Sequence, residues 1–569
     1  MTCRAMTACL IACCLAAPAA RGGDVFDGRA VSFARKIDVD ALELLGAQQS
    51  GRTAILDTLA RGQLKQMCGS PDVESLPAVF AYLELYFNSG RYVDRPVIHI
   101  REKQMRGFIE RELTGKAAKA FARTSRISPA TLLDEQAWDI FGRSGRAREA
   151  DRSRARGVGT LRNALAELAE KKQFRLPIDR LSARYSSYLA VGILRVVPTG
   201  EDHWLALEEA LITREGRPNP SPPPVAAKWA EMADAWRRRD AETVNRVIGE
   251  LSDQLPRAAG KSYPSLGKRN LERLYNRANQ GTAVWIGFAV SLALLIVAAA
   301  TTARWAHWAG MGVFWASTAV LLAAFIVRWI VSGKAWYLPP IMNQFEAVIG
   351  AALLGAAVAI VLEIAWQKNY FALSAALYAT ISLLACVMFP DEMGAGIRAM
   401  PGILSSPIMA VHVAVIIVGH ALAGMTLVIS LAYVFGAIGS KLAATPDGPA
   451  SRPSSPPDLR PTGELSRLGE IDRCNLIVAQ LACWTVVMGT LLGAYWGDFA
   501  WGRWWGWDPK ETWALITSLI YVAVVHVRFV TPVRWRGWAT AIGCILGCGV
   551  MLFNWIVVNY VLAGMHSYA

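Results

Sequence analysis

The two halves of the chain differ in how apolar and polar residues are arranged. Residues 282–562 contain eight apolar runs, whereas residues 24–280 mix charged and apolar positions and contain no run of membrane length. A helix that crosses a bilayer needs about 20 apolar residues, a length that the seventh run reaches only marginally. The runs lie at 282–301, 311–332, 346–366, 371–389, 407–435, 474–496, 512–528 and 538–562.

This pattern predicts a polytopic α-helical membrane bundle of about eight transmembrane helices over residues 281–569, preceded by a mainly helical domain over residues 24–280. Residues 218–224 are rich in proline and predict a loop within the first domain. Three stretches of that domain show a helical period with few β-branched residues, at 42–67, 161–172 and 229–255.

The composition agrees with a soluble part joined to a membrane part. The 569 residues are 53% hydrophobic and 18% charged, which is too apolar for a purely soluble protein and too charged for a purely membrane one. The formal net charge of +14 is typical of inner-face loops and lipid headgroup contacts in a bilayer protein. We therefore expect membrane lipid, and no nucleic acid, among the partners.

The N-terminus predicts export. Arg4 supplies a charge, an apolar run follows, and residues 17–19 (Ala-Pro-Ala) fit a small-residue cleavage site, so residues 1–20 are predicted to be a signal peptide. Residues 10–13 (Leu-Ile-Ala-Cys) also resemble a lipoprotein cleavage site, which leaves the type of signal peptidase open. With residues 24–280 exported, the first transmembrane helix runs inward and the later ones alternate.

The basic residues support this topology, because lysine and arginine are more frequent in the predicted inner segments than in the outer connections. The inner segment 436–473 is rich in proline and serine and predicts a mobile cytoplasmic linker. The location expected is therefore the bacterial inner membrane, with the N-terminal domain on the periplasmic side. The inner basic residues are Arg304, Lys368, Lys441, Arg452, Arg460, Arg467, Arg473, Arg528, Arg534 and Arg536, and the outer ones are Arg328, Lys334, Arg398, Arg503 and Lys510.

Residues 495–513, between two apolar runs and on the predicted outer side, concentrate tryptophan. Indole rings offer broad apolar faces with one N–H donor and favour the membrane–water boundary. Spaced by glycines, they predict a platform for a flat apolar ligand, and an aromatic belt that anchors helix ends is the alternative. The six tryptophans of this stretch, among 21 in the chain, are Trp496, Trp501, Trp504, Trp505, Trp507 and Trp513.

Two histidines fall at the same predicted level as these tryptophans. His412 lies about one turn into the fifth run, and His566 follows the eighth. Neutral imidazoles are good axial ligands for haem iron, and two of them complete its coordination above and below the macrocycle. The sequence therefore predicts an outer haem site with His412 and His566 as ligands and the indoles as its floor.

Three further histidines are candidates for an inner site. His526 is about 21 Å deeper than Thr512, and His420 is about 12 Å deeper than His412, at 1.5 Å per helical residue. Ionisable groups inside a membrane are functional candidates, although a hydrogen bond to a neighbouring helix explains His420 equally well. His307, in the predicted inner loop after the first run, is the third candidate.

The segment 501–517 (Trp-Gly-Arg-Trp-Trp-Gly-Trp-Asp-Pro-Lys-Glu-Thr-Trp-Ala-Leu-Ile-Thr) resembles the tryptophan-rich WWD signature of haem-handling proteins and, among them, CcsA/ResC-type cytochrome c biogenesis proteins. Residues 404–413, 526–528 and 564–568 resemble that family's first external, intramembrane and C-terminal external histidine motifs. Residues 343–347 (Asn-Gln-Phe-Glu-Ala) are similar to its Asn-x-Tyr-Glu-Ser segment. The resemblance covers residues 282–569.

The first domain carries a second resemblance. Residues 49–61 (Gln-Ser-Gly-Arg-Thr-Ala-Ile-Leu-Asp-Thr-Leu-Ala-Arg) resemble a segment of the ResB-like partner in fused CcsB/CcsA forms. The usual CcsB-type membrane helices, with their own histidine, are not evident. The partner of His526 therefore stays open between His420, His307 and a histidine on a separate CcsB/ResB-type subunit.

The resemblance implies a cytochrome c haem lyase that moves haem b to the outer face and joins it to apocytochrome c. In that reading His412 and His566 ligate the iron, the tryptophans hold the macrocycle, and Asp508 and Lys510 orient propionates or peptide. Capping of the seventh helix explains Asp508 and Lys510 equally well. None of the ten cysteines forms a Cys-x-x-Cys pair, so a separate thioredoxin-like reductant is implied.

Two other functions remain open. A haem exporter or chaperone that passes haem on without joining it fits the same residues. A membrane electron-transfer cytochrome b predicts paired histidines buried across facing helices, whereas here the best pair flanks an external loop.

Overall fold

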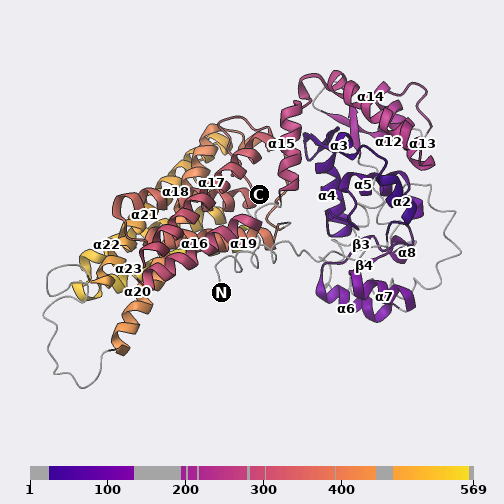
Figure 1. Cartoon of the computed structure of the whole chain (residues 1–569). Helices are drawn as coiled ribbons and strands as arrows, with labels where there is room; N and C mark the ends of the chain where they lie inside the picture. Colours follow the sequence, from indigo (N-terminus) through magenta and orange to yellow (C-terminus); the bar gives the residue numbers. More distant parts are fainter. Residues whose placement is uncertain are drawn as a thin grey trace. The chain divides into compact units, whose positions relative to one another are not determined.

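The structure is a computed structural model of the chain (Figure 1). It divides into two compact units between Asn276 and Arg277, close to the predicted boundary at residue 280. The predicted signal peptide, the predicted helix at 161–172 and His566 lie outside the described residues. The structure describes residues 25–113, 115–132, 194–199, 203–213, 217–278, 282–301, 303–390, 392–400, 402–443, 466–559 and 561–562.

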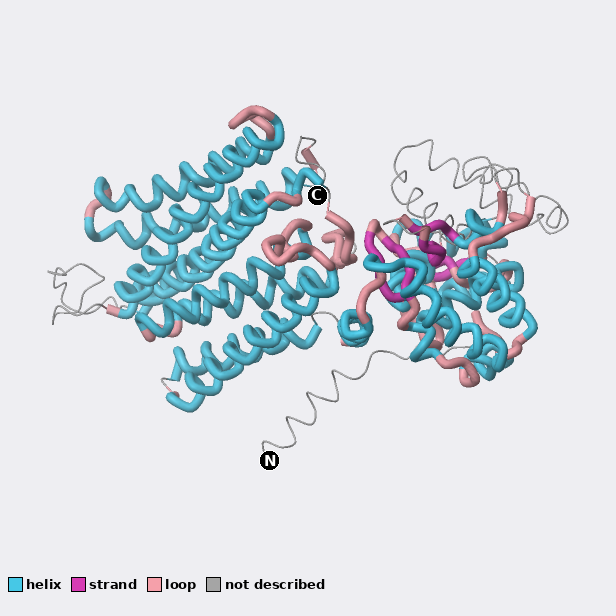
Figure 2. The backbone as a smooth tube through the Cα atoms, turned by 90° about the horizontal axis from the view of Figure 1, so that it is seen from above, coloured by secondary structure: helices cyan, strands magenta, loops and turns pink. Residues whose placement is uncertain are grey.

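The first unit is mainly helical, with three short antiparallel strand pairs that hold all of the strands in the described residues (Figure 2). The pairs are β1 (Gly46–Gln49) with β2 (Arg52–Ile55), β3 (Ile98–His99) with β4 (Arg126–Ile127), and β5 (Arg195–Pro198) with β6 (Trp204–Ala206). The helices are α2 (Gly28–Ala34), α3 (Val39–Glu43), α4 (Leu56–Cys68), α5 (Ala78–Phe87), η1 (Ser89–Arg91), α6 (Lys103–Glu112), α7 (Gly115–Thr124), α8 (Pro129–Leu132), α12 (Leu207–Leu211), α13 (Pro224–Arg238), α14 (Ala241–Ala259), η4 (Gly260–Ser262) and α15 (Leu266–Arg277).

Two of the helices predicted in this unit are interrupted. The stretch 42–67 contains the β1–β2 hairpin, because Ser50 and Gly51 both adopt positive φ, 52° and 79°, as a two-residue hairpin turn requires. The stretch 229–255 breaks at Arg239, whose φ of 61° ends α13, and Asp240 then caps α14. The period of apolar residues runs through both breaks, so it did not reveal them.

The hairpin and α4 are tied to α15, the last helix of the unit. Arg52 of the hairpin pairs with the buried Glu272 of α15, with Nη2 and Oε1 2.6 Å apart. The side-chain amide of Asn276 donates to Asp57 Oδ2 of α4 at 2.9 Å. The segment that resembles a ResB-like protein therefore braces the helix that leads into the second unit.

Glu84 of α5 is the buried charge at the centre of this unit's core, with a side-chain exposure of 0%. It accepts hydrogen bonds from Tyr92 Oη at 2.7 Å, Trp236 Nε1 at 2.8 Å and Arg239 Nη2 at 2.7 Å. Burial raises the pKa of Glu84, but these donors together outweigh burial and hold the pKa below its usual value.

The first unit should therefore lose stability in acid. A lowered folded pKa contributes stability above the unfolded pKa of about 4.3 and loses it as the pH falls through the folded value. Replacing Glu84 by Gln leaves Arg239 without its partner charge and should lower the free energy of unfolding by roughly 3 kcal/mol at pH 7. The same change should remove the loss of stability in acid. Hydrogen exchange of α5 and α13 peptides in the full chain measures both effects. The exposed Asp253→Asn is the control, and equal behaviour of the two variants would contradict the assignment.

The second unit confirms the predicted bundle, since eight helices of the described residues are long and apolar enough to cross a membrane. They are α16 (Thr282–Thr301), α17 (Arg304–Ser332), α18 (Gln344–Trp366), α19 (Tyr370–Met388), α20 (Pro407–Ala443), α21 (Arg467–Trp501), α22 (Pro509–Val530) and α23 (Arg536–Phe553), with α23 continuing as the π-turn η7 (Asn554–Val558). Short 3-10 turns precede α20 and α23 at η5 (Gly402–Leu404) and η6 (Val533–Trp535).

The predicted linker at 436–473 differs from the structure at both of its ends. α20 extends to Ala443 and α21 begins at Arg467, where Ser466 caps the helix by accepting from the N–H of Gly469 at 3.1 Å. Both ends of the predicted linker are thus helical, and residues 444–465 lie outside the described residues. Composition did not reveal these helical ends.

α20 is the central helix of the bundle and contacts α18, α19, α21 and α23. Polar side chains buried between the helices pair with one another. Asn475 of α21 donates to Ser430 of α20 at 2.9 Å, and Thr426 of α20 lies 3.2 Å from the hydroxyl of Tyr521 of α22. Such pairs satisfy polar groups that would otherwise face an apolar interior.

A buried ion cluster fixes the start of α18. Glu346 and Arg328 are 1% and 2% exposed at their side chains, with Oε1 and Nη2 3.0 Å apart. Lys334 adds a second cation, with Nζ 2.9 Å from Glu346 Oε2. Asn343 caps α18 by accepting from the N–H of Glu346 at 2.8 Å. The Asn-x-x-Glu pattern thus joins the end of α17, the connection after it and α18.

Removing this charge should destabilise the bundle strongly. Glu346→Gln leaves Arg328 buried without its counter-charge, a change that costs roughly 3–5 kcal/mol in buried pairs. Thermal unfolding of the full chain in detergent measures the loss. The control is Glu470→Gln, because its pair with Lys368 is 34% and 42% exposed and should contribute at most about 1 kcal/mol. Equal effects of the two substitutions would contradict the assignment.

Candidate functional site

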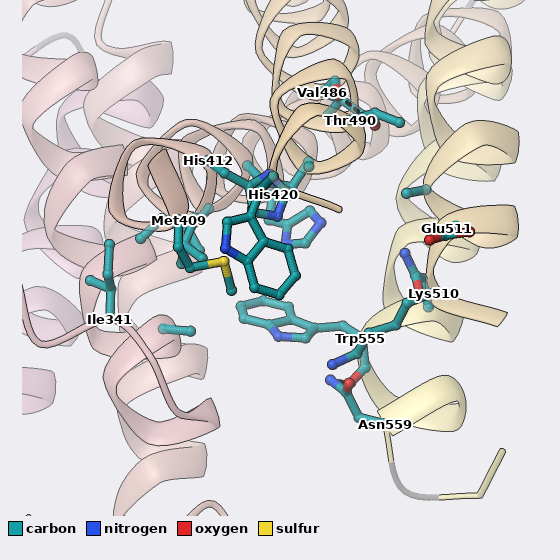
Figure 3. A pocket seen from close by; sticks show the side chains of 18 of the residues that line it. Ile341, Met409, His412, His420, Val486, Thr490, Lys510, Glu511, Trp555 and Asn559 are labelled. Atoms are coloured by element: carbon teal, nitrogen blue, oxygen red, sulfur yellow. Dashed lines mark hydrogen bonds between the residues drawn. The ribbon is translucent and has the colours of Figure 1, made fainter. Parts of the chain in front are cut away.

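A cavity of about 220 Å³ opens within the end of the bundle that carries the tryptophan-rich loop (Figure 3). Six parts of the second unit line it: α18 with the segment before it, η5, α20, α21, α22 with the loop before it, and η7 with the residue after it. These parts are far apart in sequence, so the bundle itself assembles the cavity.

His412 of α20 is held against α21 in a defined orientation. Its Nδ1 lies 2.8 Å from the carbonyl oxygen of Gly489. A ring nitrogen at that distance from a carbonyl is the protonated one, so Nε2 of the neutral imidazole carries the lone pair. Metal-binding histidines are oriented in this way, with the second ring nitrogen donating to a carbonyl or carboxylate.

Gly493 makes room for this imidazole. A Cβ atom at position 493 would lie 2.7 Å from Cε1 of His412, closer than side chains pack. The position is one helical turn beyond Gly489, so both glycines lie beneath the ring. α21 therefore supplies the hydrogen-bond acceptor and the space for His412.

The six tryptophans of residues 495–513 do not form one continuous floor. Trp496 and Trp505 line the cavity. Trp496 is only 2% exposed, and Trp501 meets it edge-on with ring centroids 4.9 Å apart and planes at 72°. Two indoles thus face the cavity, and Trp501 supports one of them from behind.

The other three tryptophans have different surroundings. Trp504 and Trp507 are 55% and 72% exposed. Trp507 adopts a φ of 58°, a left-handed conformation that non-glycine residues seldom take. Trp513, in the first turn of α22, packs against Phe553 at 4.3 Å between centroids.

Asp508 serves as the N-cap of α22. Its carboxylate accepts from the N–H of Lys510 at 3.2 Å, while Glu511 Oε2 accepts from the N–H groups of Gly506 and Asp508 at 2.7 and 3.2 Å. This capping box, with Pro509 at the first helical position, accounts for the Asp-Pro-Lys-Glu sequence. Lys510 and Glu511 line the cavity.

His420 lines the same cavity as His412, about two helical turns along α20. Its ring centroid lies 5.1 Å from that of Trp555, and its Nδ1 is buried with no hydrogen-bond partner among the described residues. His526, by contrast, is exposed on α22, with Nδ1 2.7 Å from the carbonyl oxygen of Val522. The structure thus brings His420 to the site of His412.

The other inner candidate is His307, in the first turn of α17. Its ring lies 4.9 Å from that of Trp308, and its Nδ1 is buried without a partner in the described part of the chain.

Near His526, Arg528 forms two hydrogen bonds with the carboxylate of Asp472, at 2.7 and 2.9 Å. Arg528 thereby fixes the end of α22 against α21.

The sequence reasoning missed the contribution of the last helix. Asn554, Trp555 and Asn559 line the cavity from η7 and the residue after it. Hydrogen bonds of a π-turn join residues five apart, so they bring Asn554 and Asn559 to one side, whereas an α-helix would separate them. A signal was present, since two asparagines in an otherwise apolar run are unusual in a membrane helix.

Comparison with known proteins agrees with this architecture. A family model described as cytochrome C assembly protein matches residues 341–566. The cytochrome c biogenesis protein CcsA of Prochlorococcus marinus is 32% identical over 268 residues, which cover 44% of this chain and 82% of that protein. CcsA of a Synechococcus species is 29% identical over 274 residues, with 44% and 82% covered. Protein NrfI of Wolinella succinogenes is 25% identical over 544 residues, 93% of this chain but only 54% of NrfI.

The eight helices define a polytopic membrane protein, with a cavity that two histidines of α20 line. The chain belongs to the cytochrome c assembly family, as a CcsA-type member that carries a further N-terminal unit. Membership supports a role in cytochrome c maturation. The match to NrfI extends through both units, as expected for a fused form.

If His412 binds haem iron, crowding its imidazole should weaken haem binding. Gly493→Ala places a methyl group against the ring and forces it from the carbonyl of Gly489. Loss of such an orienting partner costs roughly 10–100-fold in metal affinity. Haem titration of the purified chain, followed by absorption, measures the change. Gly439→Ala on α20 is the control, because nothing lies within 4 Å of its added Cβ, and an unchanged affinity in Gly493→Ala would contradict the assignment.

Proposed function

We propose that the chain is a cytochrome c haem lyase, which receives haem b on the exported side of the bacterial inner membrane and joins it to apocytochrome c. The observation that carries the proposal is the orientation of His412. Its Nδ1 is bound to the carbonyl of Gly489, and its ring lies at a cavity that Trp496 and Trp505 of the WWD-like segment also line.

The reaction adds two cysteine thiols of the substrate to the two haem vinyl groups. In each addition a sulfur–carbon bond forms, the thiol proton goes to the other vinyl carbon, and the carbon–carbon double bond becomes single, so no external oxidant is needed. The chain's own part is to hold the vinyl groups near the thiols, since fixed geometry lowers the barrier of such a step. The family relationship supports apocytochrome c as the substrate.

The second axial ligand is proposed to be His566, which lies outside the described residues. Haem bound between His412 and His566 has both axial positions occupied, which keeps the macrocycle in place until the substrate's own histidine replaces one of them. The cavity of about 220 Å³ is smaller than the roughly 300–1,000 Å³ of typical ligand pockets. The macrocycle would therefore be held partly within it and partly against the exposed Trp504 and Trp507.

On the inner side, we propose that His526 takes haem with a histidine of a separate CcsB/ResB-type subunit. Two observations support a partner outside the chain. His526 is exposed on α22, and His420 belongs to the cavity of His412. His307 remains the alternative within the chain. A thioredoxin-like protein would keep the substrate thiols reduced, because no Cys-x-x-Cys pair occurs in the sequence.

The alternatives are a haem exporter or chaperone without joining activity and an electron-transfer cytochrome b. A cytochrome b would hold haem between histidines on facing helices, whereas His412 and His420 lie on one helix, α20. A lyase and a chaperone would both bind haem in this cavity. Only a lyase would form the covalent product, so that product distinguishes the two.

Co-expression with an apocytochrome c tests the proposal. The wild-type chain should yield a cytochrome whose haem survives a denaturing gel and stains by peroxidase activity, and His412→Ala should lower that yield at least about tenfold. His203→Ala, in the first unit, is the control and should retain the full yield. Haem bound to the wild-type chain without any covalent product would favour a chaperone, and full joining by His412→Ala would contradict the proposed site.

A further inference from the structure

The cavity has walls of opposite character. Ile341 and Met409 lie on one side, whereas Lys510 and Asn559 lie on the other, with Trp555 between them (Figure 3). The apolar wall comes from α20 and the segment before α18. The polar wall comes from the start of α22 and the residue after η7. A ligand with one apolar and one polar edge would therefore be bound in one orientation.

Two indole N–H groups at this cavity have no hydrogen-bond partner among the described residues. They are Nε1 of Trp496 and Nε1 of Trp505, and both atoms are buried. Buried polar groups in folded proteins almost always have a partner. An indole N–H is a donor only, so a ligand that satisfies these groups must supply acceptors.

The amide of Asn559 is oriented by its neighbours. Its Nδ2 donates to Gln344 Oε1 at 3.2 Å and to the carbonyl of Trp555 at 2.7 Å. Its Oδ1 is buried without a partner in the described part of the chain, as is Oδ1 of Asn554. The cavity therefore offers acceptors from Asn554 and Asn559 as well as the donors of the two tryptophans.

The cavity lining also holds one charged group of each sign, Lys510 and Glu511. Lys510 brings an ammonium group to the cavity lining. The carboxylate of Glu511, which also lines the cavity, accepts from the N–H groups of Gly506 and Asp508 and is used in capping α22. A carboxylate accepts from ammonium and indole N–H donors, and its protonated form also donates to an amide oxygen.

We propose that Lys510, Trp496 and Trp505 bind the propionate edge of haem, with Asn554 and Asn559 beside them, and so turn its vinyl edge toward the apolar wall at Ile341 and Met409. This inference rests on the proposed function and names how the same cavity orients its substrate. Haem carries its two carboxylates on one edge and its vinyl groups away from them, which matches the two walls.

Haem b and its dimethyl ester test the orientation, because the ester keeps the macrocycle, iron and vinyl groups but removes both carboxylate charges. The full chain in detergent is titrated with each compound. Wild type should bind haem at least about tenfold more tightly than the ester. Lys510→Met and Trp505→Phe should lower haem affinity toward that of the ester while leaving ester affinity unchanged. Trp484→Phe, at an exposed position of α21 away from the cavity lining, is the control and should preserve the wild-type ratio.

Each other outcome has a defined meaning. Equal binding of haem and ester by the wild-type chain would overturn this inference and leave the proposed function standing. Variants that lose affinity for haem and for the ester to the same extent would have the same meaning. No binding of either compound by wild type would overturn the proposed function itself. If Lys510 and the tryptophans instead bind a carboxylate of the apocytochrome peptide, the variants will change the yield of joined cytochrome but not the ratio of haem affinity to ester affinity. That result would also overturn the inference.

Discussion

The geometry of the site depends on the close contact between α20 and α21. Three glycines allow it, because an added Cβ at Gly419, Gly489 or Gly493 would lie 2.7, 2.8 or 2.7 Å from Val486, Ile416 or His412. Small residues let membrane helices approach until backbone groups are within reach of side chains. At this distance the carbonyl of Gly489 meets the imidazole of His412. The chemistry of the site thus follows from helix packing.

The other walls of the cavity are held by interactions far from it in sequence. The Glu346 cluster with Arg328 and Lys334 fixes the start of α18. The capping box of Asp508 and Glu511 fixes the start of α22, and the amide of Asn559 reaches back to Gln344. Asp508, for which the sequence left haem contact and capping equally open, caps α22. Lys510, for which the sequence left the same two roles open, lines the cavity.

The sequence predicted the parts of the fold that depend on apolar length and missed those that depend on single backbone conformations. All eight spans follow from runs of apolar residues, which a bilayer requires whatever the packing. Three features depend on a few backbone dihedral angles, which the period of apolar residues does not encode. They are the hairpin at Ser50, the break at Arg239 and the π-turn at Asn554. His412 was found because of its depth and motif, whereas Asn554 and Asn559 become neighbours only through the π-turn.

The central claim is that the imidazole of His412 is a ligand of haem iron. The most direct measurement is the absorption and electron paramagnetic resonance spectrum of haem bound to the full chain, compared between wild type and His412→Gly, with and without added imidazole. The account predicts a low-spin spectrum in wild type, its loss in the variant and its recovery when imidazole fills the vacated space. An identical low-spin spectrum in His412→Gly without imidazole would contradict it.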